Sequence, residues 1–392
     1  MKVDFDAVVI GGGPAGATAA TDLARAGRHV LLLDRAGRIK PCGGAIPPRL
    51  IKDFDIPDHL IVARATAARM IAPSARTVDM PVGDGFVGMV NRETFDEWLR
   101  ARAALAGAER RTGTFTALER DADGTAVIVY TEGRGGTERR VRTRAVIGAD
   151  GARSGVARAA LKGGGRTPCV FAYHEVIRAP EIHADYRENR CDVVYQGAVS
   201  PDFYGWVFPH GDTASVGVGS AHKGFALRES VGRLRAQSGL AGCETLRVEG
   251  APIPMKPLRR WDNGRDVLVT GDAAGVVAPA SGEGIYYAMT CGRFAADAVS
   301  TFLATGRPQA LRAARRGFMR AHGRVFWVLG MMQHFWYRSD KRRERFVSIC
   351  DDKDVQKLTW QAYMNKELVR AEPMAHIRIF LKDMSHLLGL AA

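Results

Sequence analysis

The sequence lacks long apolar runs, paired cysteines and any leader before its first apolar stretch. Its 392 residues contain no run of about 18 apolar residues, so we expect no membrane-spanning helix. An apolar segment begins within a few residues of Met1, so we expect no signal peptide. The six cysteines form no C-x-x-C pair and have no histidine cluster beside them, which disfavours a disulfide framework and a metal site. We therefore expect a cytoplasmic protein of two or three structural units, with no bound metal.

Nucleic-acid-binding motifs are also missing, although the chain is strongly basic. There are 56 Lys and Arg residues against 42 Asp and Glu, a formal net charge of +14. Such a charge is typical of proteins that bind nucleic acid, an anionic membrane surface or an anionic ligand. Because no nucleic-acid fold motif accompanies the charge, we expect no nucleic-acid partner. Peripheral membrane contact or a diphosphate-bearing ligand explains it better.

The first motif opens the chain. The apolar run 6–10 predicts a buried strand, which leads into GGGPAG at 11–16 and a small-residue helix at 17–26. Each glycine of a G-x-G-x-x-G turn has its own role. Here Gly11 permits the tight turn, Gly13 lets a pyrophosphate approach the backbone, and Gly16 lets the helix pack closely on the strand. A second strand at 29–33 ends in Asp34, where such folds place an acidic partner for a ribose. The alternative is a βαβ unit with a solvated Asp34. We interpret the motif as a dinucleotide site.

Two later strands also end in glycine and aspartate. Residues 145–147 lead to Asp150, and residues 266–270 lead to Asp272. The carboxyl ends of the strands are where α/β sheets bind ligands. The glycine-rich segment 280–285 then opens a helix whose N-terminus is a further preformed anion site.

Other stretches leave alternatives open. The glycine- and proline-rich segment 39–48 is either a functional loop or a plain connector. Arg92, ahead of a helix that begins at Glu93, could contact a cofactor phosphate or lie on a solvated surface. Residues 166–255 predict a mostly antiparallel sheet. Its aromatic stretch 201–209 is either core or an apolar ligand groove.

Together, the three strand-end signals resemble the FAD-binding pattern of the flavoprotein hydroxylase and geranylgeranyl reductase superfamily. KPCGGA at 40–45 and PDFYGWVFP at 201–209 resemble signatures of the geranylgeranyl reductases. FDIP at 54–57, MIAPS at 70–74 and GMVNRETFDEWLRARA at 88–103 are similar to the branch that serves chlorophyll and bacteriochlorophyll synthesis. The resemblance covers most of the chain.

This resemblance implies an α/β fold with a Rossmann-like FAD-binding domain of the glutathione-reductase and aromatic-hydroxylase type. It further implies an inserted, mostly antiparallel β substrate domain and a C-terminal helical region. We place the FAD-binding domain at 1–165 and 256–310, the substrate domain at 166–255 and the helical region at 311–392. The helical region is basic in its first part, and it is either a packing element or a membrane-surface element.

The resemblance also implies a set of site residues. FAD would be bound by the nucleotide motifs, the KPCGGA stretch and the arginine before the predicted helix: Gly11, Gly13, Pro14, Ala15, Gly16, Asp34, Arg35, Cys42, Gly43, Gly44, Ala45, Arg92, Asp150, Gly271, Asp272, Pro279, Gly282, Gly284 and Ile285. The candidate catalytic residues are Cys42, Tyr204 and Trp206. The candidate substrate-binding residues are Tyr204, Trp206 and Phe208.

The implied reaction reduces three isolated double bonds of a geranylgeranyl chain, in sequence, to phytyl. The chain would be carried by geranylgeranyl diphosphate or by a geranylgeranylated chlorophyll or bacteriochlorophyll. Because such alkenes are not polarised, a proton must reach one carbon as reduced flavin delivers hydride to the other, which requires a dry channel and a nearby acid. Cys42 is the first candidate for a residue near the reacting bond, positioning the alkene or relaying the proton.

The electron donor and the class of protein have alternatives. One full nucleotide-binding fingerprint is present, so NADPH would visit transiently or ferredoxin would serve, and the family favours NADPH. A flavin-dependent aromatic monooxygenase would share the three FAD motifs but gives no reason for KPCGGA and YGWVFP. A non-catalytic prenyl-lipid carrier would not need the intact glycines and Asp272.

Overall fold

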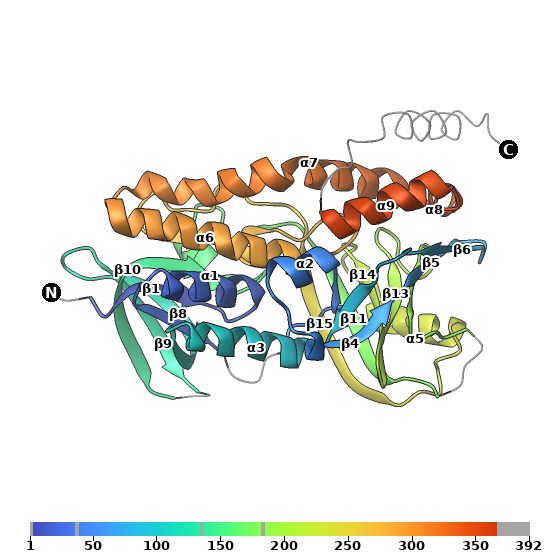
Figure 1. Ribbon diagram of the computed structural model, residues 1–392, viewed down its shortest axis with the longest axis horizontal. Helices are drawn as coiled ribbons and strands as arrows, with labels where there is room; N and C mark the ends of the chain where they lie inside the picture. Colours follow the sequence, from blue (N-terminus) through green and yellow to red (C-terminus); the bar gives the residue numbers. More distant parts are fainter. Residues whose placement is uncertain (1–2, 36–38, 134–135, 182–184, 367–392) are drawn as a thin grey trace. The chain divides into compact units, whose positions relative to one another are not determined.

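The computed structural model describes residues 3–35, 39–133, 136–181 and 185–366. These residues form two units, each made of three chain segments (Figure 1). The first unit comprises Met1–Lys40, Arg92–Cys169 and Pro252–Gly323. The second comprises Pro41–Asn91, Val170–Ala251 and Arg324–Ala392.

This division differs from the predicted domains in two places. Residues 41–91, which the sequence assigns to the FAD-binding domain, group with the second unit because strand β5 (Ala67–Ile71) pairs with β12 (Arg190–Val194). The predicted helical region 311–392 is divided between Gly323 and Arg324. The part of that region from 367 to 392 lies outside the described residues.

The first unit is built on a six-stranded sheet. Its strands are β1 (Phe5–Ile10), β2 (Val30–Asp34), β8 (Glu109–Arg120), β9 (Ala126–Glu132), β10 (Glu138–Gly148) and β16 (Val267–Val269). β1 lies between β2 and β10 and is parallel to both, with Val8 opposite Leu31 on one side and Val146 on the other. Strands buried on both faces form continuous apolar runs, which is why the sequence identifies β1, β2, β10 and β16. All four lie close to their predicted positions.

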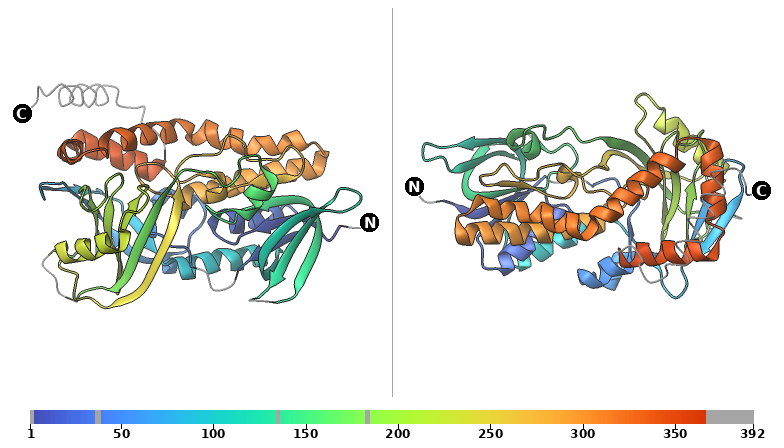
Figure 2. Two further views of the ribbon diagram at one scale, coloured as in Figure 1. Left: turned by 180° about the vertical axis from the view of Figure 1, so that it is seen from behind. Right: turned by 90° about the horizontal axis from the view of Figure 1, so that it is seen from above.

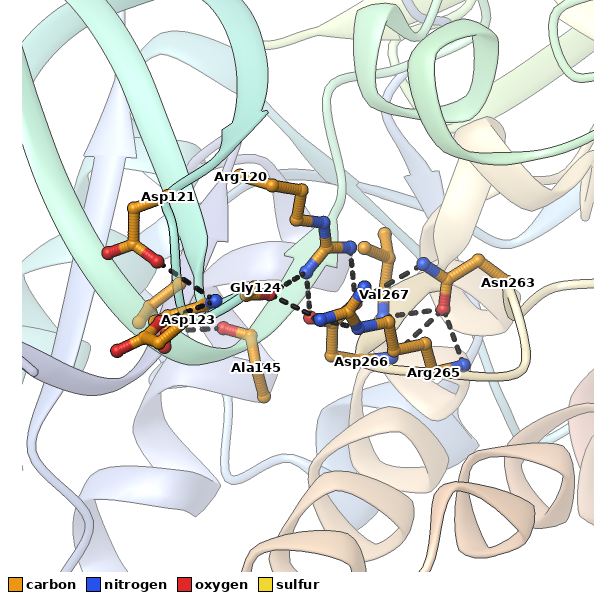
Figure 3. A network of polar contacts seen from close by, with 11 residues as sticks. Arg120, Asp121, Asp123, Gly124, Ala145, Asn263, Arg265, Asp266 and Val267 are labelled. Carbon is orange, nitrogen blue, oxygen red and sulfur yellow. Dashed lines mark hydrogen bonds and ion pairs between the residues drawn. The ribbon is translucent and has the colours of Figure 1, made fainter.

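An antiparallel meander extends from this sheet. β9 pairs with the first half of β10 and the second half of β8, across a turn at Asp121–Gly124. Figure 3 shows the polar network beside that turn. Arg120 donates two hydrogen bonds to Asp266, one of them Nη2–Oδ1 at 2.7 Å, and Oδ1 of Asn263 accepts from the backbone N–H groups of Asp266 and Val267. The network fixes the start of β16 against the meander.

Helices cover the first unit's sheet. They are α1 (Pro14–Arg25), α3 (Arg92–Leu105), α4 (Gly155–Ala160), α6 (Ile285–Thr305), the short 3₁₀ turns η2 (Gly271–Ala274) and η3 (Pro308–Leu311), and the first part of α7 (Arg312–Trp336). α1 and α6 lie side by side (Figure 1). A Cβ atom on Gly292 of α6 would overlap the carbonyl oxygen of Ala15, so the small residues predicted for both helices are what let them approach. The predicted α/β fold class is confirmed.

The second unit contains a seven-stranded sheet in the order β15-β11-β14-β13-β12-β5-β6. The strands not yet given are β6 (Thr77–Pro81), β11 (Cys169–Arg178), β13 (Gly205–His210), β14 (Thr213–Ser220) and β15 (Thr245–Pro254). Helix α5 (Leu227–Gln237) packs on one face, which we call the α5 face (Figure 2), through Val231 and Leu234 against Val207 and Val216. Alternate residues of β13, among them Trp206 and Phe208, lie on the opposite face, which we call the inner face.

A three-stranded sheet packs on the inner face beside β13. Its order is β3 (Ala45–Ile46), β7 (Val87–Val90) and β4 (Ile61–Ala65). The predicted loop 39–48 therefore contains a two-residue edge strand, because Ala45 pairs with Met89. The remaining helices of this unit are α2 (Pro48–Asp53), η1 (Asp58–Leu60), α8 (Asp340–Ile349) and α9 (Lys353–Asn365). No helix in the described part of the chain is long and apolar enough to cross a membrane.

Candidate functional site

The glycine turn after β1 is shaped by close contacts. Gly11 has φ +104°, and a Cβ atom there would overlap the carbonyl oxygen of Ala149 at the end of β10. A Cβ atom on Gly16 would overlap the carbonyl oxygen of Gly11, so α1 starts directly against the turn. The sequence prediction of a tight turn and close helix packing agrees with both contacts.

Gly13 differs from these two glycines because its Cβ position faces open space. Nothing lies within 4 Å of that position. Gly13 is the N-cap of α1, Pro14 begins the helix and no acidic residue lies in its first turn. The positive end of the helix dipole and the first-turn N–H groups of Ala15 and Gly16 are therefore uncompensated by an acidic side chain, which suits a pyrophosphate. The residues present fit the dinucleotide that the motif predicts.

Arg100 is a site residue that the sequence analysis missed. Its Nη1 donates to the carbonyl oxygen of Gly12 at 3.3 Å and to Oδ2 of Asp34 at 3.2 Å. The arginine thereby holds the Asp34 carboxylate beside the glycine turn. A signal was available, because Arg100 lies two helical turns after Arg92 in the predicted helix. Arg35 follows Asp34 as an exposed residue at the end of β2.

Arg92 is the first residue of α3 and is buried, with 5% of its surface exposed. Nε donates to Oδ1 of Asp96 at 2.9 Å and Nη2 donates to Oδ2 at 2.7 Å. The solvated-surface alternative for Arg92 is therefore wrong, since a buried guanidinium is satisfied here by a bidentate carboxylate. Its contact with a cofactor phosphate stays a prediction.

The Asp150 carboxylate caps the helix that follows it. Its oxygens accept hydrogen bonds from Ser154 Oγ at 2.5 Å and from the N–H of Gly155 at 2.6 Å. The carboxylate thus neutralises the start of α4 and fixes the loop after β10, whose backbone lies against Gly11. Any direct contact of Asp150 with the cofactor stays a prediction.

Asp272 lies in η2, directly after β16, and its side chain is almost completely buried. A Cβ atom on Gly271 would stand 2.6 Å from Cβ of Ala15, which shows how closely η2 lies to the start of α1. The Asp272 carboxylate pairs with Nζ of Lys40. Lys40, the first residue of KPCGGA, was not predicted as a site residue. The ion pair holds this carboxylate near the dinucleotide turn.

A second helix start without a side-chain cap lies at the beginning of α6. Ala280 and Gly282 both have positive φ, and the Gly282 N–H donates to the carbonyl oxygen of Ala278 at 3.0 Å. This tight turn ends at Gly284, the N-cap of α6, which has no side-chain cap and no acidic residue in its first turn. The backbone from Pro279 to Ile285 therefore presents another anion-favouring helix N-terminus, as predicted from the sequence.

In the second unit, the KPCGGA loop lies on the aromatic strand β13. A Cβ atom on Gly43 would stand 2.9 Å from Cδ2 of Phe208 and 3.9 Å from Nε1 of Trp206. Gly44 has φ +71°, and its Cβ position lies 2.5 Å from Nε2 of His210. The N–H of Gly44 donates to Sγ of Cys42 at 3.4 Å. The structure thus brings together two motifs that lie about 160 residues apart in the chain.

The three predicted substrate-side aromatics form a row on the inner face. Ring centroids of Tyr204 and Trp206 lie 6.1 Å apart, and those of Trp206 and Phe208 lie 6.3 Å apart. Tyr204 and Trp206 are buried and Phe208 is half-buried. Burial, reinforced by Tyr337 and Cys42, raises the pKa of Tyr204 far above its usual range, so its hydroxyl stays protonated.

His210 at the end of β13 is a second residue that the sequence analysis missed. It is buried beside Gly44, and its Nδ1 lies 3.2 Å from the carbonyl oxygen of Phe208. Burial lowers the pKa of His210 to about 4, so the imidazole is neutral at physiological pH. Nothing in the local sequence distinguishes it from a surface histidine at a strand end.

Comparisons with known proteins identify the families and relatives that this chain matches. Residues 5–194 match the pyridine nucleotide-disulphide oxidoreductase family, and residues 225–386 match the lycopene cyclase protein family. The geranylgeranyl diphosphate reductase of Rhodobacter capsulatus is 58% identical over 386 residues, which cover 98% of each chain. The chloroplastic geranylgeranyl diphosphate reductase of Oryza sativa subsp. japonica is 37% identical over 98% of this chain and 86% of its own.

Solved structures show the same fold. A geranylgeranyl bacteriochlorophyll reductase-like protein from Thermoplasma acidophilum superposes with a TM-score of 0.80 at 22% identity, over 95% of this chain and 99% of its own. A flavin-dependent brominase superposes with a TM-score of 0.70 at 16% identity, over 97% of this chain and 99% of its own.

The chain belongs to the geranylgeranyl diphosphate reductase family. It is an oxidoreductase, and the match to the pyridine nucleotide-disulphide oxidoreductase family, together with the flavoprotein fold, implies a flavin cofactor.

Proposed function

We propose that this chain uses FAD and NADPH to reduce the three isolated double bonds of a geranylgeranyl chain, in sequence, to phytyl. The observation that carries the proposal is the packing of the Cys42–Gly44 loop on the aromatic row of β13, in a chain 58% identical to a geranylgeranyl diphosphate reductase. An aromatic row beside a glycine-rich loop offers the apolar surface that a prenyl chain needs. An aromatic monooxygenase would give this pairing no such use, and a prenyl-lipid carrier would not need the two glycine-capped helix starts of the first unit.

The first unit would hold the cofactor. The α1 start at Gly13 would bind the pyrophosphate, and Asp34, held by Arg100, would bind the adenosine ribose. Asp272 would bind the ribitol, with Lys40 balancing its charge. The start of α6 near Gly284 would stabilise negative charge on the flavin ring. When bound, reduced FAD supplies the two electrons of each reduction as a hydride equivalent, with NADPH as their source.

The second unit would bind the prenyl chain and deliver the proton. Tyr204 and Trp206 exclude water from one side of the loop, because both are buried in the aromatic row. Cys42 lies beside Gly44, and its thiol is the group that we place closest to the alkene. There it would position the double bond or relay a proton. Burial keeps the Tyr204 hydroxyl protonated at neutral pH by raising its pKa, so this hydroxyl is a second candidate proton donor in the same unit.

The prenyl chain could be carried by a diphosphate or by an esterified bacteriochlorophyll or chlorophyll. The net charge of +14 suits a diphosphate, and it equally suits an anionic membrane that holds the pigment. Competition between the two substrates in one assay would rank them by kcat/KM.

Peripheral membrane contact, from the cytoplasm, completes the proposal. Trp327 and Met331 lie four residues apart on α7 and are 68% and 51% exposed. Arg324 lies one helical turn before Trp327 and is also exposed. Exposed apolar and cationic side chains on one helix face suit the surface of an anionic bilayer. Double substitution W327S/M331S should reduce sedimentation with phosphatidylglycerol vesicles, whereas L105S, which alters an exposed leucine of the first unit, should not.

One anaerobic experiment tests the function. The purified protein is mixed with NADPH and either geranylgeranyl diphosphate or geranylgeranylated bacteriochlorophyll, while the visible spectrum and product masses are followed. We expect a yellow flavin spectrum that bleaches, and products that gain mass in two-hydrogen steps. A colourless protein that binds prenyl lipid would instead support the carrier. NADPH-coupled oxygen uptake with a hydroxylated product, measured in air, would support the monooxygenase.

A further inference from the structure

A buried polar chain runs across the inner face of the seven-stranded sheet, beside Trp206. In the strand register His174 of β11 lies opposite Gly217 of β14, and Gly217 lies opposite Trp206 of β13. Gly217 has no side chain, and a Cβ atom there would overlap the indole of Trp206 and lie 2.5 Å from Cβ of His174. The imidazole and the indole therefore meet across the glycine, with ring centroids 6.2 Å apart.

Ser215, two residues before Gly217 on β14, joins the two rings. Its Oγ lies 3.1 Å from Nε1 of Trp206 and 2.9 Å from Nδ1 of His174. An indole N–H can only donate, so the Ser215 hydroxyl accepts from Trp206, and it lies within hydrogen-bond distance of the imidazole. Ser215 thus fixes the rotation of the indole and links it to the imidazole.

The far side of His174 completes the chain of donors and acceptors. A carboxylate can only accept, so Nε2 of His174 donates to Oε2 of Glu249 at 2.9 Å. Glu249, on β15, also forms an ion pair with Arg247. His174 and Ser215 are each 2% exposed. A buried network in which the indole N–H and the imidazole Nε2–H each meet an acceptor holds its members in one arrangement.

We propose that Ser215, His174 and Glu249 are positioning residues for Trp206, and that the indole they hold sets where a prenyl double bond rests beside the Cys42–Gly44 loop. The inference rests on the proposed function, since it assigns Trp206 to the substrate. The Nε1 edge that Ser215 holds is also the edge nearest Gly43, 3.9 Å from its Cβ position. A rotation of the indole would therefore change the space between the aromatic row and the loop.

The test compares S215A with S215T, which keeps the hydroxyl, and with S230A as a matched control. Ser230 is also fully buried in this unit, but it lies on α5 and donates to the carbonyl oxygen of Val199 at 2.6 Å. The protein has six tryptophans, and each indole N–H group gives a signal in a ¹⁵N–¹H spectrum. The Trp206 signal is identified by its loss in W206F.

We expect S215A to move the Trp206 indole signal and to speed its hydrogen exchange, with the other five tryptophan signals unchanged. KM for the prenyl substrate should rise about fivefold, and incompletely reduced products should accumulate, while NADPH-driven bleaching of the flavin keeps its rate. S215T and S230A should behave as the wild type, and H174F should reproduce S215A.

Two outcomes would overturn the inference while leaving the function intact. One is an S215A protein whose Trp206 signal moves but whose KM and product pattern match the wild type. The other is movement of all six tryptophan signals in S215A, which would show a general structural effect. If the wild type itself does not reduce a prenyl chain, the proposed function fails, and the indole signals still report whether the network holds Trp206.

Discussion

Gly43 packs so closely against the phenyl ring of Phe208 that no side chain fits between them, since a Cβ atom on Gly43 would stand 2.9 Å from the ring. G43A must therefore displace the Cys42–Gly44 loop or the ring. We expect turnover to fall at least about tenfold, because small misplacements of reacting groups are costly. The measurement is steady-state turnover at matched flavin content.

The matched control for G43A is G232A. Gly232 lies in α5 of the same unit with nothing within 4 Å of its Cβ position, and alanine favours a helix over glycine. G232A should keep full turnover. Equal activity in both variants would show that the loop and the aromatic row need not touch for catalysis.

Gly13 and Gly16 allow cofactor binding and folding to be separated. G13D places an N-cap aspartate in open space, so the fold should keep its stability or gain about 0.3 kcal/mol. Its carboxylate should nevertheless prevent FAD binding by occupying the helix start with negative charge. G16A forces a Cβ atom onto Gly11 and should cost about 1–3 kcal/mol of stability. Visible absorbance and urea unfolding of the apoproteins measure the two effects. A G13D protein that purifies with full FAD would refute the pyrophosphate assignment.

His210 should make the protein less stable in acid. Its pKa is lowered by burial from 6.5 to about 4, so between these values the unfolded state binds a proton that the folded state does not. The free energy of unfolding should therefore fall as pH drops from 6.5 towards 4, by up to about 3 kcal/mol from this group. H210Q should flatten that slope in urea titrations at successive pH values. H59Q, at an exposed histidine, should leave it as in the wild type.

Cys42 and Tyr204 can be tested as the source of the proton. C42A should lower kcat by a factor of about 10²–10⁴ if the thiol relays the proton, with the flavin spectrum retained. Y204F keeps the ring and removes the hydroxyl, so a similar loss there would assign the donor to Tyr204 instead. C243A, at a half-buried cysteine of the same unit, is the control. Undiminished turnover in C42A would remove Cys42 from the chemistry.

The sequence predicts the parts of this molecule whose physics is local. A buried parallel strand followed by glycines has a pattern of its own, so the amino-acid sequence alone predicts β1, β2, β10 and β16 and their carboxyl ends. The same holds for the starts of α1 and α6, because a glycine N-cap followed by a first turn without acidic residues can be recognised from the residues themselves.

What the sequence does not reveal depends on pairing across long distances. Three pairs of residues come into contact only once the strands and helices are assembled. They are the ion pairs Arg100–Asp34 and Lys40–Asp272 and the neighbouring rings of His174 and Trp206. The grouping of 41–91 with the second unit has the same cause, since β5 pairs with a strand more than 100 residues later. Burial, too, is a tertiary property, which is why Arg92 and His210 look like surface residues in the sequence.

The alternation of segments between the two units has a consequence for synthesis. β10 cannot pair with β16 until the ribosome has passed residue 269, and by then the chain has entered the second unit twice. Neither unit exists as a continuous fragment, so neither can finish folding while most of the other is still unmade. Such long-range pairing slows folding and leaves strand edges exposed on the nascent chain. We expect chaperone dependence during expression, and truncated chains that end before β16 to emerge without flavin.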